Sequence, residues 1–132
     1  MILLIDDERL VMQYYVRELK RVGFQVKQCF DPDSTFEFIE KKKPEISLII
    51  LDIMMLPGKK YQGADTENGL RTGLFILNDL RDKFPDVPIV VLTNVADVNT
   101  LKQFQGIPQL SILQKLDCTP RCLVQTIRKM KK

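Results

Sequence analysis

The sequence contains no histidine, and its three cysteines, Cys29, Cys118 and Cys122, form no CxxC pair. Because zinc is held mainly by cysteine and histidine, a zinc site is not expected. Unpaired cysteines in odd number are typical of a cytosolic protein whose thiols stay reduced. Histidine is also the commonest general base, so any chemistry must come from carboxylates, lysines and hydroxyl groups.

The chain also lacks long apolar runs and a strong net charge. No apolar run reaches the roughly 20 residues of a membrane-spanning helix. Met1 leads directly into strand-like residues, which leaves no room for a signal peptide. The net charge of +3 is too small to indicate nucleic-acid binding. We therefore expect a cytoplasmic protein with no direct contact to nucleic acid or membrane.

The 132 residues, 45% hydrophobic and 28% charged, suit a single domain over residues 1–132. Short apolar runs predict strands at 1–5, 24–29, 46–51, 89–92 and 110–113, of which 24–29 alternates like an edge strand. Apolar residues at helical spacing predict helices at about 8–22, 32–43, 74–84, 97–105 and 120–130. This alternation predicts an α/β fold with a parallel sheet and helices on both faces.

Polar residues stand at the carboxyl ends of four predicted strands: Asp6 and Asp7, Asp52, Thr93 and Lys115. Each has an ordinary explanation as a turn residue, a solvated charge or a helix cap, and we expect Asp7 to cap the first helix. In a parallel sheet, however, these ends lie along one edge, where open α/β sheets bind ligands. The joint arrangement therefore predicts one shared site.

The residue types at this edge fit together chemically. Three clustered carboxylates repel one another unless a cation sits among them, and Mg²⁺ prefers oxygen ligands. The Lys115 ammonium and the Thr93 hydroxyl can neutralise and orient the oxygens of a phosphoryl group. A carboxylate is also a nucleophile that can form an acyl phosphate. The site is therefore interpreted as a phosphate acceptor with Asp52 as the nucleophile.

In their order and spacing, these motifs resemble the receiver domain of two-component response regulators. The resemblance covers essentially the whole chain and rests on four motifs: Ile5-Asp6-Asp7-Glu8, Leu51-Asp52, Val91-Leu92-Thr93 and Lys115. It implies a flavodoxin-like three-layer fold with a five-stranded parallel sheet of order 2-1-3-4-5. It also implies a signalling domain that is no enzyme beyond its self-catalysed phosphoryl transfer.

The resemblance further implies a ligand set and partners. Asp6, Asp7, Asp52 and the backbone carbonyl of Met54 would hold Mg²⁺. Asp52 would receive its phosphoryl group from a sensor histidine kinase or a phosphotransfer protein, with Lys115 and Thr93 at the phosphoryl oxygens. The domain would then signal to a downstream effector protein. The fourth helix, fifth strand and fifth helix would form the output face, which a homodimer would also use.

Several positions depart from the family pattern. Pro57 falls one residue late, Asn94 replaces a small residue, and Leu116 follows the lysine where proline is common. The polar segment 57–72 makes its loop about a dozen residues longer than usual. These departures keep open the alternative of a degenerate receiver, which would bind partners without being phosphorylated.

Two other classes of protein with a related fold are disfavoured. A flavodoxin-type electron carrier needs a Ser/Thr/Gly-rich phosphate loop after the first strand, where Asp6-Asp7-Glu8 would repel the flavin phosphate. A Mg²⁺-dependent aspartate phosphatase needs a second acid two residues after its nucleophile, and Met54 stands there.

Two expectations concern the surroundings of Asp52. We expect segment 57–72 to be a mobile flap outside the core, because it is polar and contains Gly58, Gly63 and Gly69. We also expect slow loss of the phosphoryl group, because Met54 and Val95, the residues that would flank an attacking water, are apolar.

Overall fold

The computed structural model describes residues 1–69, 71–94, 98–104 and 106–130. The elements follow in the order β1 (Ile2–Ile5), α1 (Arg9–Arg21), β2 (Val26–Cys29), α2 (Pro32–Lys42), β3 (Leu48–Leu51), α3 (Thr72–Lys83), β4 (Ile89–Thr93), α4 (Val98–Lys102), β5 (Leu110–Gln114), the short 3₁₀ helix η1 (Lys115–Asp117) and α5 (Pro120–Met130). No helix in the described ranges is both long and apolar enough to cross a membrane.

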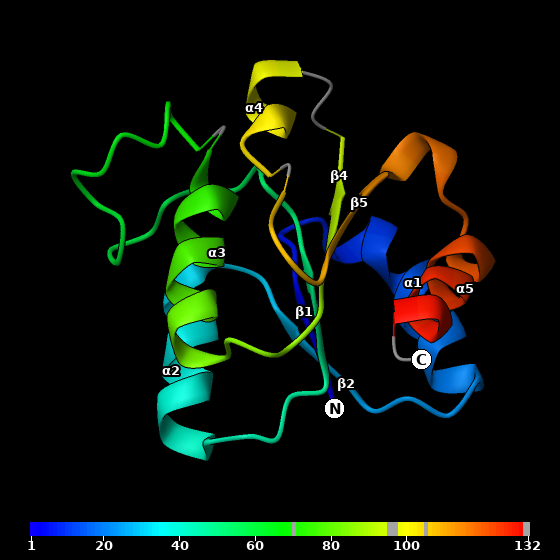
Figure 1. Ribbon diagram of the computed structural model, residues 1–132. Helices are drawn as coiled ribbons and strands as arrows, with labels where there is room; N and C mark the ends of the chain where they lie inside the picture. Colours follow the sequence, from blue (N-terminus) through cyan, green and yellow to red (C-terminus); the bar gives the residue numbers. More distant parts are fainter. Residues whose placement is uncertain (70, 95–97, 105, 131–132) are drawn as a thin grey trace.

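The five strands form one parallel sheet of order β2-β1-β3-β4-β5, which confirms the predicted flavodoxin-like topology. Figure 1 shows α1 and α5 on one face of the sheet and α2 and α3 on the other. Every residue of β1, β3 and β4 is buried. In β2, by contrast, Lys27 is exposed, Val26 and Gln28 are partly exposed and only Cys29 is buried, which agrees with its place at an edge of the sheet.

Hydrophobic side chains fill both faces of the sheet. In β1, Ile2 and Leu4 belong to the cluster under α1 and α5, whereas Leu3 and Ile5 belong to the cluster under α2 and α3. This alternation follows from the two-residue period of a strand. Burial on both faces fixes the strands, so their carboxyl ends are held in register at one edge.

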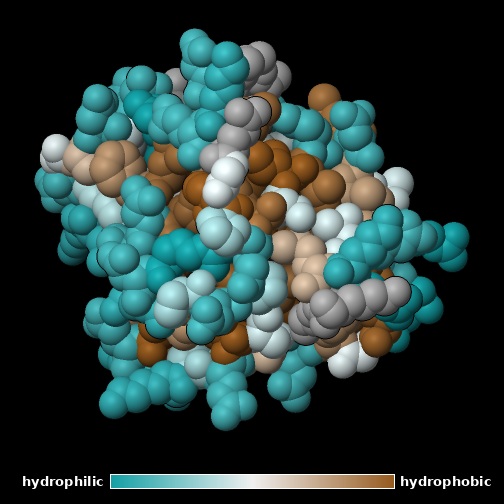
Figure 2. Space-filling view, in the orientation of Figure 1, coloured by the Kyte–Doolittle hydropathy of each residue, from teal (hydrophilic) through white to brown (hydrophobic). Residues whose placement is uncertain are grey.

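The second sheet edge, formed by β5, is only partly covered. All five residues of β5 are partly exposed. In the orientation of Figures 1 and 2, this edge faces the reader, and hydrophobic surface gathers in the middle of the view. A partly exposed, apolar sheet edge is a surface at which another protein can bind.

The helix starts agree with the sequence in one case and differ in another. Asp31 caps α2 as expected for an Asp-Pro start, because its carboxylate accepts a hydrogen bond from Ser34 N at 2.6 Å. The expectation that Asp7 caps α1 was wrong. The cap residue of α1 is Glu8, and Asp6 Oδ1 instead accepts a hydrogen bond from Glu8 N at 2.9 Å. Of the predicted fourth helix, residues 97 and 105 lie outside the described ranges.

The expectation that segment 57–72 lies outside the core was also wrong. Tyr61 is 7% exposed and belongs to the cluster under α2 and α3. Its ring meets Phe36 edge-on with centroids 6.4 Å apart and lies 5.7 Å from the ring of Phe75. Its hydroxyl donates a hydrogen bond to Asp79 Oδ2 at 2.5 Å. Because Tyr61 packs against α2 and α3, it fixes the middle of this otherwise polar segment to these two helices.

Both ends of the segment are held by hydrogen bonds as well. The Asp33 carboxylate in α2 accepts hydrogen bonds from Lys59 N and Lys60 N, each at 2.8 Å. At the other end, Met55 N donates to Gly69 O at 3.0 Å. A β-carbon at Gly69 would lie 2.7 Å from Met55 O, so only glycine permits this close approach.

Candidate functional site

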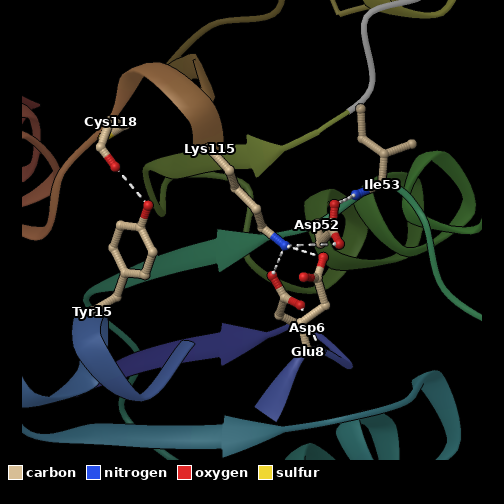
Figure 3. Close-up of polar contacts among 7 residues, drawn as sticks. All are labelled: Asp6, Glu8, Tyr15, Asp52, Ile53, Lys115 and Cys118. Atoms are coloured by element: carbon tan, nitrogen blue, oxygen red, sulfur yellow. Dashed lines mark hydrogen bonds and ion pairs between the residues drawn. The ribbon is translucent and has the colours of Figure 1, made fainter. Parts of the chain in front are cut away.

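The predicted polar residues converge at the carboxyl edge of the sheet. Asp6 follows β1, Asp52 follows β3, Thr93 ends β4 and Lys115 follows β5. The register explains the convergence, because Ile5 pairs with Leu51 and Thr93 pairs with Gln114. Figure 3 shows the Lys115 side chain pointing from η1, directly after β5, toward the carboxylates that follow β1 and β3.

Lys115 joins three carboxylates. Its Nζ lies 2.8 Å from Asp6 Oδ2, 2.8 Å from Glu8 Oε1 and 3.4 Å from Asp52 Oδ2. Its side chain is only 5% exposed. No cis peptide bond occurs among the described residues, so a trans bond to Leu116 suffices to bring the lysine into the site.

Asp52 is buried and held in a defined orientation. Its Oδ1 accepts a hydrogen bond from Ile53 N at 2.8 Å, and its other oxygen faces Lys115. Burial raises the pKa of Asp52, against the lowering effects of Lys115, the Thr93 side-chain hydrogen bond and Ile53 N–H. The Thr93 side chain is fully buried. One oxygen of Asp52 is thus fixed by the backbone, while the other is directed into the cluster.

The cluster carries more negative than positive charge. Burial, followed by the charge of Asp52, raises the pKa of Asp6 to about 6, although Lys115 and Glu8 N–H act in the opposite direction. Burial lowers the pKa of Lys115, but its carboxylate neighbours outweigh that effect and raise it, so the lysine stays charged. Asp6 Oδ2 makes the ion pair with Lys115 but no well-directed hydrogen bond.

These residues suit a hard divalent cation. Asp6, Glu8 and Asp52 each offer a carboxylate oxygen, and the three oxygens lie within 4.8 Å of one another. Carboxylate oxygens are the donors that Mg²⁺ prefers. The cluster holds three carboxylates but one ammonium group, and Asp6 Oδ2 is poorly satisfied. A bound cation would neutralise the remaining negative charge.

Two of the predicted ligands lie beside this cluster and not in it. Asp7 is exposed, and Met54 is 38% exposed. Both line a recess of about 210 Å³. In the chain, Asp7 directly follows Asp6 of the cluster, and Met54 follows Ile53, whose N–H bonds to Asp52. Val95, expected with Met54 to exclude water, lies outside the described residues, and Asn94 is exposed.

Sequence reasoning missed Glu8, which takes the place in the cluster that was expected for Asp7. Because α1 begins only at Arg9, Glu8 lies before the first turn, and its side chain reaches back to Lys115. The signal in the sequence was the third consecutive acid after β1. The direction of the Glu8 side chain depends on where α1 begins. A shift of this start by one residue changes which of the three acids points into the cluster.

In metal-free buffer, we expect Asp6→Asn to raise the free energy of unfolding at pH 7. The pKa of Asp6 is raised from 3.8 to about 6, so between these values the folded state binds more protons than the unfolded state. The contribution of Asp6 to stability is therefore fully present below about pH 4 and is lost as the pH rises through about 6. The loss is on the order of 2–3 kcal/mol, since one pKa unit corresponds to about 1.4 kcal/mol.

Urea unfolding between pH 4 and 8 in EDTA checks this prediction. The parent should lose stability across the lower half of this range, and Asp6→Asn should lose less. Asp82→Asn is the matched control, because Asp82 is exposed on α3. Identical pH dependence in the parent and Asp6→Asn would contradict the assignment of the raised pKa.

Comparisons with known proteins agree with this fold. Residues 2–128 match the family described as "Response regulator receiver domain". The receiver domain of NtrX from Brucella abortus aligns with a TM-score of 0.73 at 20% identity, over 100% of this chain and 99% of that chain. A CheY-like receiver domain protein from Methanospirillum hungatei aligns with a TM-score of 0.77 at 18% identity, over 98% and 92%.

A third similar structure holds bound groups. It is a response regulator protein from Burkholderia pseudomallei with a phosphorylated aspartic acid, a calcium ion and citrate. It aligns with a TM-score of 0.71 at 21% identity, over 98% of this chain and 71% of that chain. At such identities, the likeness to these three structures concerns the fold.

Proposed function

Because this chain belongs to the family of response regulator receiver domains, we propose that Asp52 accepts a phosphoryl group in a Mg²⁺-dependent reaction. The domain, spanning residues 1–132, then signals by changing its protein contacts. The observation that carries the proposal is the buried cluster in which Lys115 Nζ lies within 3.4 Å of the Asp52 carboxylate. Receiver domains are signalling modules and not classical enzymes.

The proposed chemistry assigns a role to each atom of the cluster. Asp52 Oδ2 attacks phosphorus while Oδ1 stays on Ile53 N–H. A new O–P bond forms, and the P–N bond of a phosphohistidine donor breaks. The transferred group then carries its charge into the cluster. The Lys115 ammonium and the Thr93 hydroxyl bind the carboxylate before the transfer and would then bind the phosphoryl oxygens instead.

Asp6, Asp7, Asp52 and the carbonyl of Met54 are the proposed Mg²⁺ ligands, and Glu8 joins the candidates because of its place in the cluster. When bound, Mg²⁺ supplies positive charge that stabilises the transferring phosphoryl group. The excess of carboxylates over ammonium groups supports this assignment. The Burkholderia protein, whose structure contains a phosphorylated aspartic acid and a calcium ion, is consistent with it.

We expect Mg²⁺ to raise the melting temperature of the parent protein. A ligand that binds only the folded state adds about 2.7 kcal/mol at a concentration one hundred times its Kd. Asp6→Asn and Asp7→Asn should weaken this response, whereas Asp82→Asn should keep it. Thermal melts with increasing MgCl₂, compared with EDTA, measure the response. If both carboxylate variants respond like the parent, the cation binds elsewhere.

The proposed partners are a sensor histidine kinase or phosphotransfer protein as donor and an effector protein as receiver of the signal. The partly exposed β5 edge and its apolar surface (Figure 2) support a contact through α4, β5 and α5, with an effector or a second copy of this chain. The free thiols of Cys29, Cys118 and Cys122 fit the proposed cytoplasmic location.

Incubation with acetyl phosphate tests the proposal directly. Intact-mass spectrometry should show one phosphoryl group per chain in MgCl₂ and far less labelling in EDTA. Absence of labelling in both, in a protein that melts cooperatively, would instead favour a degenerate receiver that binds partners without phosphate.

A further inference from the structure

The long segment between Met55 and α3 ends at the proposed Mg²⁺ site. Asn68 and Gly69 line the 210 Å³ recess together with Asp7, Met54 and their neighbours. Asp7 and the carbonyl of Met54 are proposed ligands of the cation, so the recess borders two members of the proposed ligand set. Among the described residues of segment 57–72, Asn68 is the one with a polar side chain that lines the recess.

The position of Asn68 is fixed by its neighbours. Gly69 O accepts a hydrogen bond from Met55 N, and Gly69 N donates one to the Thr66 hydroxyl at 3.3 Å. Thr66 is buried, and its carbonyl accepts from Arg71 N at 2.9 Å. Because the residue that follows Asn68 is bonded to the strand-end loop of Asp52, Asn68 cannot move independently of the site.

The backbone at this tip is in an uncommon conformation. Glu67, Asn68 and Gly69 follow one another with φ values of 53°, 57° and 94°. Asparagine and glycine enter the left-handed region readily, whereas glutamate does so only at an energetic cost. The surrounding hydrogen bonds hold this turn in place, and the turn is what presents Asn68 to the recess.

An asparagine side chain at this place has a specific chemical use. Its amide oxygen is a neutral, hard donor of the kind found in Mg²⁺ and Ca²⁺ sites, and it can also hydrogen-bond water on the cation. We propose that Asn68 adds an amide oxygen to the Mg²⁺ site and thereby raises its affinity for the cation. This inference rests on the proposed function, since it assumes that the recess belongs to a Mg²⁺ site.

The structure supplies a matched pair of variants. Asn68→Gly removes the amide while keeping a residue that adopts the left-handed conformation. Glu67→Gly makes the same kind of change at the neighbouring left-handed residue, which is exposed like Asn68 but does not line the recess. Asn68→Asp keeps an oxygen in place and adds a charge. Melting temperatures in EDTA show whether each variant keeps its fold.

Isothermal titration with MgCl₂, without any phosphodonor, gives the Kd. We expect Asn68→Gly to raise the Kd about tenfold, Glu67→Gly to leave it unchanged and Asn68→Asp to lower it. Equal Kd values for the parent and Asn68→Gly, with Mg²⁺ still bound, would overturn the role of Asn68 and leave the proposed function standing. A parent protein that does not bind Mg²⁺ would overturn both.

Discussion

Asp52→Asn should carry no phosphoryl group after incubation with acetyl phosphate and MgCl₂, while the parent carries one. Asparagine matches aspartate in size but lacks the charged oxygen that would attack phosphorus. The side chain is 3% exposed, and its Oδ1 bond to Ile53 N–H can be kept by the amide oxygen. The expected effect is therefore complete loss of labelling with the fold retained.

The charges around Asp52 indicate that Asp52→Asn keeps its fold, so the labelling result can be interpreted directly. Lys115 would still be paired with Asp6 and Glu8 in the variant. Removal of one carboxylate also relieves repulsion, because the charge of Asp52 helps to raise the pKa of Asp6. In EDTA, the melting temperature of Asp52→Asn should therefore equal or exceed that of the parent, so a missing label cannot be attributed to unfolding.

Intact-mass spectrometry, followed by peptide mapping, measures the label. Asp82→Asn controls for the loss of one carboxylate, because Asp82 lies exposed on α3. Undiminished labelling of Asp52→Asn would show that another side chain is the acceptor. It would also remove the main support for placing the phosphoryl group beside Lys115 and Thr93.

The sheet and its polar edge could be predicted because each strand is marked by the pattern of its own few residues. Continuous apolar runs mark strands buried on both faces, and alternation in residues 24–29 marks an edge strand. Right-handed crossovers leave few topologies for such a pattern. Once the strands are parallel, the residues that follow them must share an edge, which brings Asp6, Asp52, Thr93 and Lys115 together without any knowledge of their contacts.

The direction of individual side chains could not be predicted in the same way. Glu8 and not Asp7 joins Asp6 and Asp52 in the cluster, because α1 begins one residue later than expected. Helix boundaries depend on local hydrogen bonds that periodicity does not specify. Tyr61 stands alone in a polar segment, so no repeating pattern marks it as buried. Its burial depends on Phe36 and Phe75, which are distant in sequence.

Tyr61→Ala should be among the most destabilising substitutions in this chain. The ring is 7% exposed and packs between aromatic residues of α2 and α3. Truncation of a buried aromatic residue to alanine costs about 3–5 kcal/mol, since a cavity remains where the ring was. For a domain of this size, such a loss lowers the melting temperature by roughly 10 °C or more.

Tyr14→Ala is the matched control, because Tyr14 is 65% exposed on α1. It should change the free energy of unfolding by no more than about 0.5 kcal/mol. Tyr61→Phe separates the ring from its hydroxyl. It should cost only about 1 kcal/mol, the usual value of one hydrogen bond, because Asp79 is itself 40% exposed and can bind water.

Replacement of residues 59–67 by a short Gly/Ser link tests the same packing contact by removing the segment that carries Tyr61. The link removes Tyr61 and the two backbone N–H groups that bond to Asp33. It should therefore destabilise the domain at least as much as Tyr61→Ala, by denaturant unfolding at pH 7. If the link and Tyr61→Ala both leave the free energy of unfolding near that of the parent, the segment is a surface addition. Its tip could then not hold Asn68 in place beside Asp7.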